Sequence, residues 1–471
     1  MADIIKPDLC VIGAGSLGIE LAISARQRGL DVVLVRRDIA EAGDGPHASL
    51  QRAAFVASAA RAQAMRSAAT LGLNNSEPKP NFRTIGEHAA AIADSVSPCD
   101  SDERLTALGI TVLSGAPRFM DKSTLRCGDT TIRARQFALA TGAAPVIPAL
   151  PGLDQVAFFT PDTIADNLRK LSHLVVIGGE PAAFELAQAY HRLGSKVTVV
   201  PQGGLLPGFD PELVAPLLRS LREEGLAILE DAEVTAIVPR SQGTGVTLLR
   251  AGGEDSLDVS HILVAMGRLP DLDPALLEKA DLRRDRIRAD HLLVGPDGQT
   301  SNGRISALGG AAGQFEPHLA RLQAGLLLDR LTGRGKSRFD PQQAPRLLMT
   351  EPALAQVGLM DGKAPLRAGQ RVLRANLAEN NAARALGAPH GTGKLVVNAK
   401  GQLVGAALLG SGAGETIAML ALAMARGLPL AELARLALPQ PSLAQLLVTL
   451  AEEFAAEQPR SSWTRRFTAR R

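Results

Sequence analysis

Aromatic residues, net charge and cysteine are all scarce in this sequence, and each shortage excludes a class of protein. Aromatic side chains make up 3% of the 471 residues, with one Trp and one Tyr. The chain therefore has few rings on which the bases of single-stranded nucleic acid could stack. The 51 Lys and Arg nearly balance the 48 Asp and Glu, which leaves a net charge of +3. No basic excess therefore indicates a nucleic-acid partner.

The three cysteines, Cys10, Cys99 and Cys127, stand far apart, without a CxxC or CxxxxC pattern. This spacing excludes a zinc ribbon and a redox dithiol formed by sequence neighbours. It fits a reducing compartment, and we expect a cytoplasmic protein. The eight histidines are scattered and form no HExxH motif, so we expect no metal site.

Long apolar runs are also missing, since none approaches the ~20 residues that cross a bilayer. The N-terminus carries acidic residues and soon enters a glycine loop, unlike a secretory signal peptide. With 46% hydrophobic and 21% charged residues, the composition is that of a soluble globular protein. Its length allows roughly three domains.

The beginning of the chain predicts a βαβ unit. A strand is expected over residues 9–12, a helix over 17–28 and a Val-rich strand over 31–35, with Gly29 ending the helix. The order of these elements is that of a mononucleotide-binding unit with a parallel pair of strands.

A GxGxxG motif of Gly13, Gly15 and Gly18 joins the first strand to the helix. These glycines permit a tight turn, the approach of a phosphate and close helix packing, so the loop predicts nucleotide binding. The acid that binds the adenosine ribose about 20 residues on is replaced by Arg36, which cannot accept a hydrogen bond. Three interpretations stay open: Arg36 meets a phosphate, Asp38 takes over from the acid, or Arg36 belongs to a solvated surface pair.

A second βαβ unit is predicted further along the chain. Strands are expected over residues 174–177 and 196–200, with a helix over 182–193 between them. Two such units in one chain imply two nucleotide-shaped clefts.

The glycine loop of this second unit is altered. Gly178 is present, but Glu180 stands at the second glycine position, Ala183 at the third and Pro201 at the strand-end acid. A carboxylate at the second position would face a pyrophosphate as a like charge. Nucleotide binding and a retained fold with a dead pocket therefore both stay open for this cleft.

The last part of the sequence predicts an α+β domain on an antiparallel sheet. The expected strands cover residues 371–374, 394–398 and 403–409, and the expected helices cover 413–426, 429–436 and 442–456. The basic tail 459–471 is expected to be disordered.

Motifs along nearly the whole chain resemble the flavoprotein pyridine nucleotide–disulfide oxidoreductases, and the mercuric reductase and dihydrolipoamide dehydrogenase branch in particular. The motifs are VIGAGSLG (11–18), LATGAAPVIPALPGL (139–153), VVIGGEPAAFELAQAYHRLGSKVTVV (175–200), AMGRLPDL (265–272), TSNGRISALGG (300–310), MTEPALAQVGL (349–359), GKLVVNAKGQLVGAALLGSGAGETI (393–417) and PQPSLAQLL (439–447). Their order and spacing together carry the resemblance.

The resemblance implies an α/β fold with two Rossmann-like nucleotide-binding domains, of FAD and NAD(P) type, and a C-terminal α+β dimerisation domain. The FAD domain would be discontinuous, over residues 1–150 and 271–335. The NAD(P)-like domain would cover 151–270 and the dimerisation domain 336–458. A homodimer is implied as well, because members complete each active site with the partner's C-terminal domain.

The resemblance also assigns cofactor-binding residues. FAD is expected as cofactor, and NAD(P)H remains open because the second loop is altered. The candidates are Gly13, Gly15, Ser16, Gly18, Arg36, Ala116 near the adenine, Thr141 and Gly142 over the cofactor, Gly309 and Gly310 near the ribityl chain and pyrophosphate, and Gly178 and Gly267.

Departures from the family pattern concern its sulfur chemistry first. The family's CxxxxCxxxK pattern places Gly43 and Ala48 where the two redox cysteines would stand and Arg52 at the lysine. Without two thiols no dithiol–disulfide exchange can occur. Cys99 and Cys127 do not match a flavin position of the family, and we expect both to be unreactive. Disulfide, lipoamide and mercuric reductase activities are therefore not expected.

The residues at the family's acid–base positions also differ from the family pattern. The family's His-Pro and Glu, which supply an acid–base pair from the second subunit, correspond to Gln440, Pro441 and Gln445. An amide neither takes nor gives a proton near neutral pH. The family's Gly-Asp at the ribityl chain becomes Gly309–Gly310, which removes a charged hydrogen bond of about 1.5–3 kcal/mol.

One charged pair of the family survives as Arg52 and Glu185. In the family these positions hold a lysine near flavin N5 and a facing glutamate, so both are candidate catalytic residues; a salt bridge between two domains is the structural alternative. The sequence thus favours an FAD-binding oxidoreductase without a dithiol, whose electron acceptor is a protein or small molecule. A non-catalytic relative that keeps the fold to bind a ligand or partner is the alternative.

Overall fold

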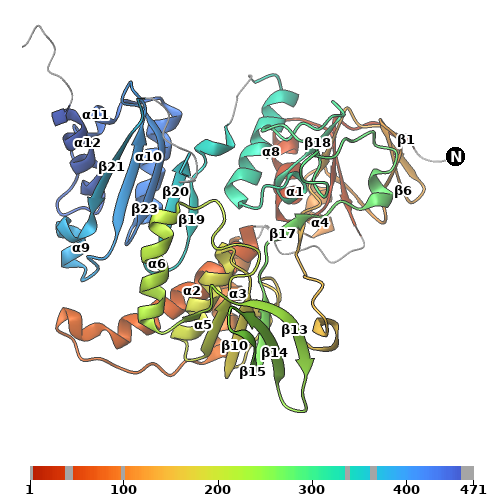
Figure 1. Ribbon diagram of the computed structural model, residues 1–471. Helices are drawn as coiled ribbons and strands as arrows, with labels where there is room; N and C mark the ends of the chain where they lie inside the picture. The colour runs from red at the N-terminus through yellow and green to blue at the C-terminus, as the bar shows by residue number, and fades with distance from the viewer. Residues whose placement is uncertain (1–3, 38–45, 97–100, 335–339, 361–368, 458–471) are drawn as a thin grey trace, which may run out of the picture. The chain divides into compact units, whose positions relative to one another are not determined.

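The computed structural model describes residues 4–37, 46–96, 101–334, 340–360 and 369–457 (Figure 1). The chain divides into two compact units. The first comprises Met1–Gln63, Pro78–Leu205 and Leu226–Pro341, and the second comprises Ala64–Glu77, Leu206–Gly225 and Gln342–Arg471.

The first unit contains a five-stranded parallel sheet in the order β18-β8-β2-β3-β4. Its strands are β2 (Leu9–Ile12), β3 (Val32–Arg36), β4 (Thr111–Ser114), β8 (Gln136–Leu139) and β18 (Ile305–Ala307). All four residues of β2 are buried, because it is the central strand. The strand order reverses on either side of β2, and such a switch point is where open α/β sheets bind ligands.

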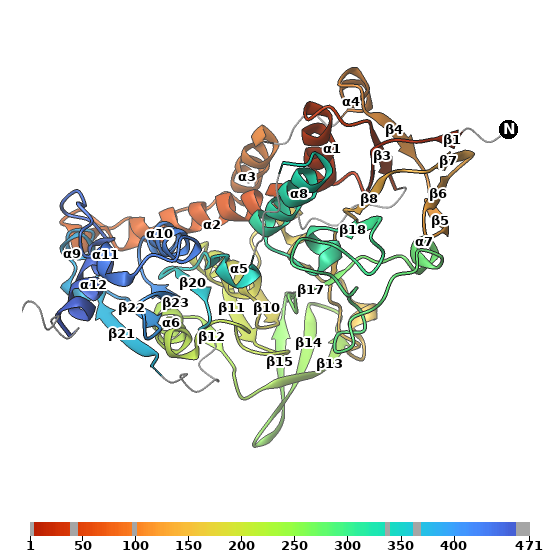
Figure 2. The ribbon, with the colours of Figure 1, turned by 90° about the horizontal axis from the view of Figure 1, so that it is seen from above.

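Two helices cover one face of this sheet. They are α1 (Ser16–Gln27) and α8 (Pro317–Leu331), which lie side by side (Figures 1 and 2). The other face packs on a smaller four-stranded sheet and on α7 (Pro274–Leu277). The smaller sheet consists of β1 (Ile4–Ile5), β7 (Thr130–Ile132), β6 (Thr124–Cys127) and β5 (Arg118–Asp121). Three further helices of this part of the chain are α2 (Pro46–Arg66), α3 (Phe82–Val96) and α4 (Asp102–Ala107).

A second parallel sheet in the first unit has the order β12-β11-β10-β16. It is built from β10 (His173–Ile177), β11 (Lys196–Val200), β12 (Ala227–Ile228) and β16 (His261–Val264), with α5 (Pro181–Arg192) crossing from β10 to β11. An antiparallel meander of β13 (Glu233–Pro239), β14 (Thr244–Arg250) and β15 (Gly253–Val259) packs on it. The short strands β9 (Ala143–Pro145) and β17 (Arg268–Pro270) pair with each other.

The second unit is an antiparallel sheet with helices on both faces. Its strands are β19 (Arg346–Leu348), β20 (Leu354–Gly358), β23 (Leu403–Leu409), β22 (Thr392–Val397) and β21 (Arg371–Asn376), in that order. Its helices are α6 (Pro211–Glu224), α9 (Asn381–Ala385), α10 (Ala413–Ala425), α11 (Leu430–Leu433) and α12 (Gln445–Glu457). Figure 2 shows α10 on one side of the sheet and α6 on the other.

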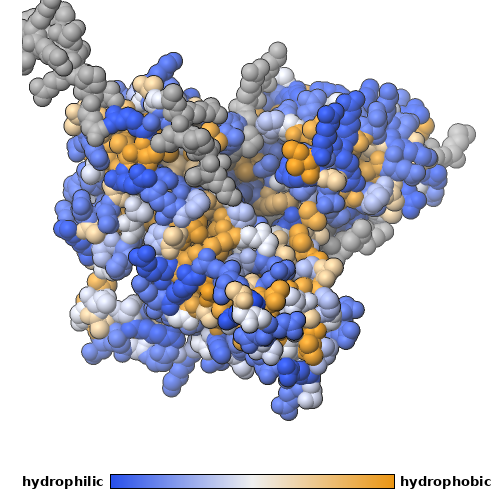
Figure 3. Space-filling model, in the orientation of Figure 1, coloured by the Kyte–Doolittle hydropathy of each residue, from blue (hydrophilic) through white to orange (hydrophobic). Residues whose placement is uncertain are grey.

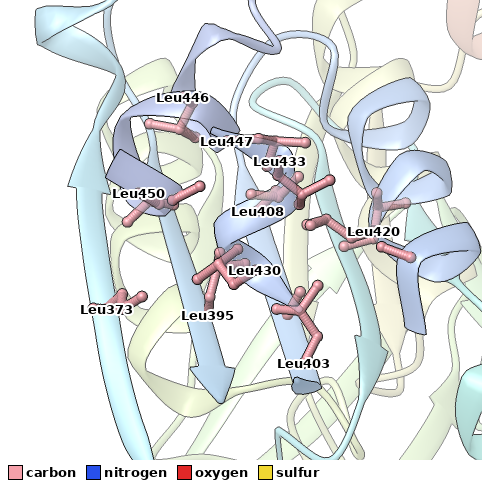
Figure 4. Close-up of a cluster of buried hydrophobic side chains, with 14 of the residues drawn as sticks. Leu373, Leu395, Leu403, Leu408, Leu420, Leu430, Leu433, Leu446, Leu447 and Leu450 are labelled. Atoms are coloured by element: carbon pink, nitrogen blue, oxygen red, sulfur yellow. The ribbon is translucent and has the colours of Figure 1, made fainter. Parts of the chain in front are cut away.

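Period-two alternation in these strands separates the two faces. One face carries leucines that pack against leucines of α10, α11 and α12 (Figure 4). The opposite face carries Lys394, which lies 2.5 Å from Asp210 and 2.8 Å from Glu212 at the start of α6. Arg374 also pairs with Glu212. The start of α6 is thus held by charges, in addition to the buried side chains of Leu213, Leu217 and Leu221 along the helix.

These observations confirm the α/β fold class with two Rossmann-like parallel sheets and a C-terminal α+β part. The domain boundaries remain predictions, and the tail 459–471 lies outside the described residues. The face drawn in Figure 3 is mainly hydrophilic, with smaller hydrophobic areas. Among the described helices, none combines the length and apolar character needed to cross a bilayer.

Candidate functional site

The first glycine turn follows the central strand β2 and leaves no room for side chains. Gly13 has a φ of +111°, and a Cβ there would lie 2.2 Å from the carbonyl oxygen of Ala140. A Cβ on Gly18 would lie 2.0 Å from the carbonyl oxygen of Gly13. Both positions therefore require glycine for close backbone packing.

Helix α1 begins at this turn with Gly15 as its N-cap. The cap makes no side-chain hydrogen bond, and the first turn, which starts at Ser16, contains no acid. A helix N-terminus with exposed backbone donors and no competing carboxylate is suited to a phosphate. The residues of this cradle therefore fit the pyrophosphate of a dinucleotide such as FAD.

The end of β3 contributes two arginines with different surroundings. Arg36 forms an ion pair of 3.0 Å with Asp102 on α4, where both side chains are partly exposed. Arg37 is 3% exposed, and its Nη2 donates to the Thr141 carbonyl oxygen at 2.9 Å and to Asp271 at 2.7 Å. Its Nε and Nη1 atoms are buried and have no hydrogen-bond partner among the residues that the structure describes. The sequence analysis missed Arg37, because its burial depends on Asp271, 234 residues away.

Other predicted FAD residues come to the same end of the sheet. The N–H of Gly115, which precedes Ala116, donates to the Arg36 carbonyl oxygen at 3.1 Å. Thr141 precedes Gly142, and its hydroxyl donates to the Asp271 carbonyl oxygen at 2.6 Å.

Gly309 and Gly310 are buried near the start of α1. A Cβ on Gly309, with a φ of +56°, would lie 2.8 Å from Leu17 and 3.0 Å from Ala320. Gly309 is thus required by packing between α1 and α8, whatever it does for a cofactor.

The two described cysteines, Cys10 and Cys127, are buried in the core and form no disulfide. Burial raises the pKa of the Cys10 thiol, and the neighbouring Cys127 raises it further. A thiol held in its neutral form is a poor nucleophile. Ala48 is on α2, whereas Gly43 and Cys99 lie outside the described residues. In the described part of the chain, no group of three acidic, His or Cys side chains could hold a metal ion.

Arg52 and Glu185 meet across the first unit, from α2 and α5. Their Nε and Oε2 atoms are 2.8 Å apart, with Glu185 2% exposed and Arg52 28% exposed. Within the described parts of the chain, the Arg52 Nε–H nevertheless forms no hydrogen bond, so the contact is an ion pair without good hydrogen-bond alignment. The structure thus brings together the two residues predicted as catalytic.

A partly open pocket adjoins Arg52 and encloses about 430 Å³ of empty space, solvent at its mouth included. Phe55 and Leu186 line it together with Tyr190, whose ring centroid lies 5.1 Å from that of Phe55. The Tyr190 hydroxyl donates to the Ile164 carbonyl oxygen at 3.2 Å. Burial raises the pKa of Tyr190 to about 12, so it stays a neutral phenol near pH 7. Sequence reasoning missed this pocket, since its walls come from four separate segments.

The second glycine turn follows β10 and is occupied by Glu180, the N-cap of α5. Gly178 has a φ of +134°, and a Cβ there would lie 2.0 Å from the Ala265 carbonyl oxygen. A Cβ on Gly267 would lie 3.4 Å from Cγ of Glu180 and 3.5 Å from its Oε1. The predicted residues Gly178 and Gly267 therefore come together around a carboxylate, and this turn does not fit a dinucleotide pyrophosphate.

The residues at the family's acid–base position lie in the second unit. Gln440 donates from Nε2 to Oε1 of Gln445 at 2.7 Å. Because neither amide titrates in the ordinary pH range, this pair can hold a group by hydrogen bonding but cannot move its proton.

The sheet topology and the first glycine cradle together define a dinucleotide-binding protein of the Rossmann class. The family model of the pyridine nucleotide-disulphide oxidoreductases matches residues 7–332, and the model of their dimerisation domain matches residues 344–451. The chain therefore belongs to the pyridine nucleotide-disulphide oxidoreductases. This family binds FAD and uses NAD(P)H, and the dimerisation domain supports a homodimer.

Similar proteins include reductases and dehydrogenases, matched over most of their lengths. A mercuric reductase of Staphylococcus aureus is 28% identical over 457 residues, covering 95% of this chain and 82% of the relative. A dihydrolipoyl dehydrogenase of Geobacillus stearothermophilus is 27% identical over 461 residues, covering 95% and 96%.

Solved structures support the same fold. The HOCl-induced flavoprotein disulfide reductase RclA from Escherichia coli superposes with a TM-score of 0.80 at 22% identity, covering 94% of this chain and 99% of that one. LpdA from Mycobacterium tuberculosis gives a TM-score of 0.80 at 23% identity, covering 95% and 99%.

Proposed function

We propose that this protein is an FAD-binding oxidoreductase that passes hydride or electrons through its flavin to an acceptor without a redox dithiol. The proposal is carried by the intact cradle at Gly13, Gly15 and Gly18, together with a sequence that has no cysteine at positions 43 and 48. The acceptor would be a small molecule or a protein partner.

FAD, when bound, would supply two-electron chemistry, and the residues of this chain would supply binding and charge. Gly13, Gly15 and Gly18 would hold its phosphates on the N-terminus of α1. Arg52 would place a permanent positive charge near the flavin, and Glu185 would fix the guanidinium's position. These two residues would stabilise charge that develops during electron transfer without moving a proton.

Disulfide, lipoamide and mercuric reductase activities are excluded under this proposal. The support comes from the buried Cys10 and Cys127 and from the amides Gln440 and Gln445. A flavin without a dithiol can reduce only acceptors that meet the flavin itself, because nothing relays electrons through sulfur.

The experiment that tests the proposal is the flavin content and turnover of native protein. Purified protein should be yellow, with about one FAD per chain, and its chemically reduced flavin should be reoxidised by a quinone probe such as menadione. Colourless protein that takes up no added FAD would overturn the proposal.

A non-catalytic relative is a second candidate, favoured by Glu180 in the second turn and by Gly310 in place of the ribityl acid. Such a protein would keep the fold to bind a ligand or partner as a homodimer. It would show no reoxidation of reduced flavin by quinone, oxygen or protein acceptors.

A further inference from the structure

The second βαβ unit has the strand arrangement of a dinucleotide-binding unit, but its glycine turn carries a negatively charged side chain. In this fold a pyrophosphate lies at the helix N-terminus, beyond the carboxyl ends of the parallel strands. Here that place is the start of α5, with β11 and β16 flanking β10. The second glycine of the motif leaves no side chain between the phosphate and the backbone. Glu180 occupies this position.

The Glu180 side chain extends from the helix N-terminus to the opposite loop. A Cβ on Gly267 would meet three of its atoms, Cγ, Oε1 and Cδ, at 3.4, 3.5 and 3.6 Å. These contacts place its carboxyl group across the turn, and it makes no side-chain capping hydrogen bond to α5. The space between the α5 N-terminus and Gly267 is therefore filled by this side chain.

The turn around Glu180 packs directly against backbone atoms, which cannot move aside to make room for a phosphate next to Glu180. A Cβ on Gly178 would lie 2.0 Å from the Ala265 carbonyl oxygen, and one on Gly179 would lie 1.6 Å from the Gly204 carbonyl oxygen. Such contacts join the first turn of this unit directly to the loops after β16 and β11. A dinucleotide could enter only by displacing Glu180.

Charge opposes entry as much as space does. The negative charge of Glu180 lies at the N-terminus of α5, where the helix dipole would otherwise favour a phosphate. Like charges brought together at an interface weaken binding, here by a factor on the order of 10² or more.

The adenosine end of the cleft offers no compensation. Pro201 stands where the ribose-binding acid would be, and it has neither a carboxylate nor a positive charge. The next residue, Gln202, already accepts the Val234 N–H with its Oε1 at 3.1 Å. Neither NADH nor NADPH would find its usual ribose or 2′-phosphate partner here.

We propose that Glu180 closes the second nucleotide cleft to nicotinamide dinucleotides. The cleft keeps the family's backbone, and one side chain from the turn itself occupies the pyrophosphate place. The proposed function rests on the first cleft and this inference on the second, so either of them can be wrong while the other holds.

Calorimetric titration of the full-length protein as purified tests this inference, with ADP-ribose, NADH and NADPH as probes. Wild-type protein should bind none of them at millimolar concentration. Glu180→Gly should bind ADP-ribose at least tenfold more tightly than wild type, and Glu180→Gln, which removes the charge but keeps the bulk, should fall between them. Glu233→Gln, an exposed position on β13, is the matched control and should behave like wild type.

Micromolar binding of NADH or NADPH by wild-type protein would overturn the inference. So would a folded Glu180→Gly variant that gains no affinity, with folding checked by thermal denaturation. Flavin content measured in the same samples separates this outcome from a failure of the proposed function, because FAD belongs to the first cleft.

Discussion

Gly13 and Gly29 both have a positive φ, yet only one of them lacks space for a side chain. A Cβ at Gly13 would lie 2.2 Å from the carbonyl oxygen of Ala140, whereas one at Gly29 meets nothing within 4 Å. Backbone strain and steric exclusion can therefore be separated in a single βαβ unit.

Gly13→Ala should abolish FAD binding or unfold the first unit. Its cost combines left-handed strain of about 1–2 kcal/mol with a backbone clash, for a total of about 3 kcal/mol or more. Gly29→Ala carries the strain alone and should lose about 1–2 kcal/mol while keeping its flavin. Urea unfolding and flavin content measure both variants. Equal losses in the two would contradict the cradle geometry.

Glu185→Gln should change the flavin itself as well as stability. The amide keeps the shape but leaves the partly exposed Arg52 guanidinium without its carboxylate partner, at a cost of about 1–3 kcal/mol. Because the local charge becomes more positive, the flavin reduction potential should rise. Arg52→Lys, which keeps the charge, should shift the potential less. A lower melting temperature with an unchanged potential would assign the pair a structural role only.

At the scale of elements, charged side chains attach the start of α6 to its sheet, beside the apolar residues that the helix buries. Arg374 binds Glu212 in a two-pronged contact, and Lys394 lies against Asp210 and Glu212. The hydrogen bonds from Arg374 hold the pKa of Glu212 at about 2, against the opposing effect of burial, with Lys394 adding to the lowering.

Acid should weaken this attachment in a defined window. Because the folded-state pKa of Glu212 lies below its ordinary value of 4.5, its stabilisation is complete above pH 4.5. It is lost progressively as the pH falls toward about 2. Glu212 is 42% exposed, so the coupling with Arg374 should be below about 1 kcal/mol. A double-mutant cycle of Glu212→Gln and Arg374→Gln should show this coupling at pH 7. A coupling that persists undiminished at pH 2 would contradict the assignment.

Both βαβ units could be predicted from the sequence because their strands are short apolar runs followed by glycine turns and apolar-spaced helices. The strand predicted over 9–12 matches β2, and the helix predicted over 17–28 matches α1, Ser16–Gln27, within a residue. The alanine-rich pattern over residues 48–71 predicts one long helix, whereas α2 ends at Arg66 and a short 3-10 segment follows at Ala68–Leu71. Helix ends depend on local capping, which alanine-rich sequence signals poorly.

The sites were less predictable than the elements, since burial depends on distant partners. Arg36 matches the motif position, but the buried arginine is Arg37, which Thr141 and Asp271 enclose. Likewise, Glu180 was visible as a like charge in the sequence, but its contact with Gly267 required the fold. Sequence separation hides such contacts from any local pattern.

At the scale of the whole molecule, the match to the dimerisation domain predicts a homodimer. Light scattering of the full-length protein should give the mass of two chains. In the family the partner's C-terminal domain completes the site, so dilution into monomers should slow flavin reoxidation by a quinone. A stable monomer with undiminished reoxidation would contradict this arrangement.

The central claim is that the molecule keeps a flavin cradle without a dithiol beside it, and an anaerobic reductive titration tests this most directly. A bound flavin takes about two electrons, and a neighbouring disulfide would take about two more. We predict that full reduction of native protein consumes about two electrons per chain, all accounted for by the loss of flavin absorbance. Uptake of about four electrons per chain, or the absence of any flavin to reduce, would contradict the account.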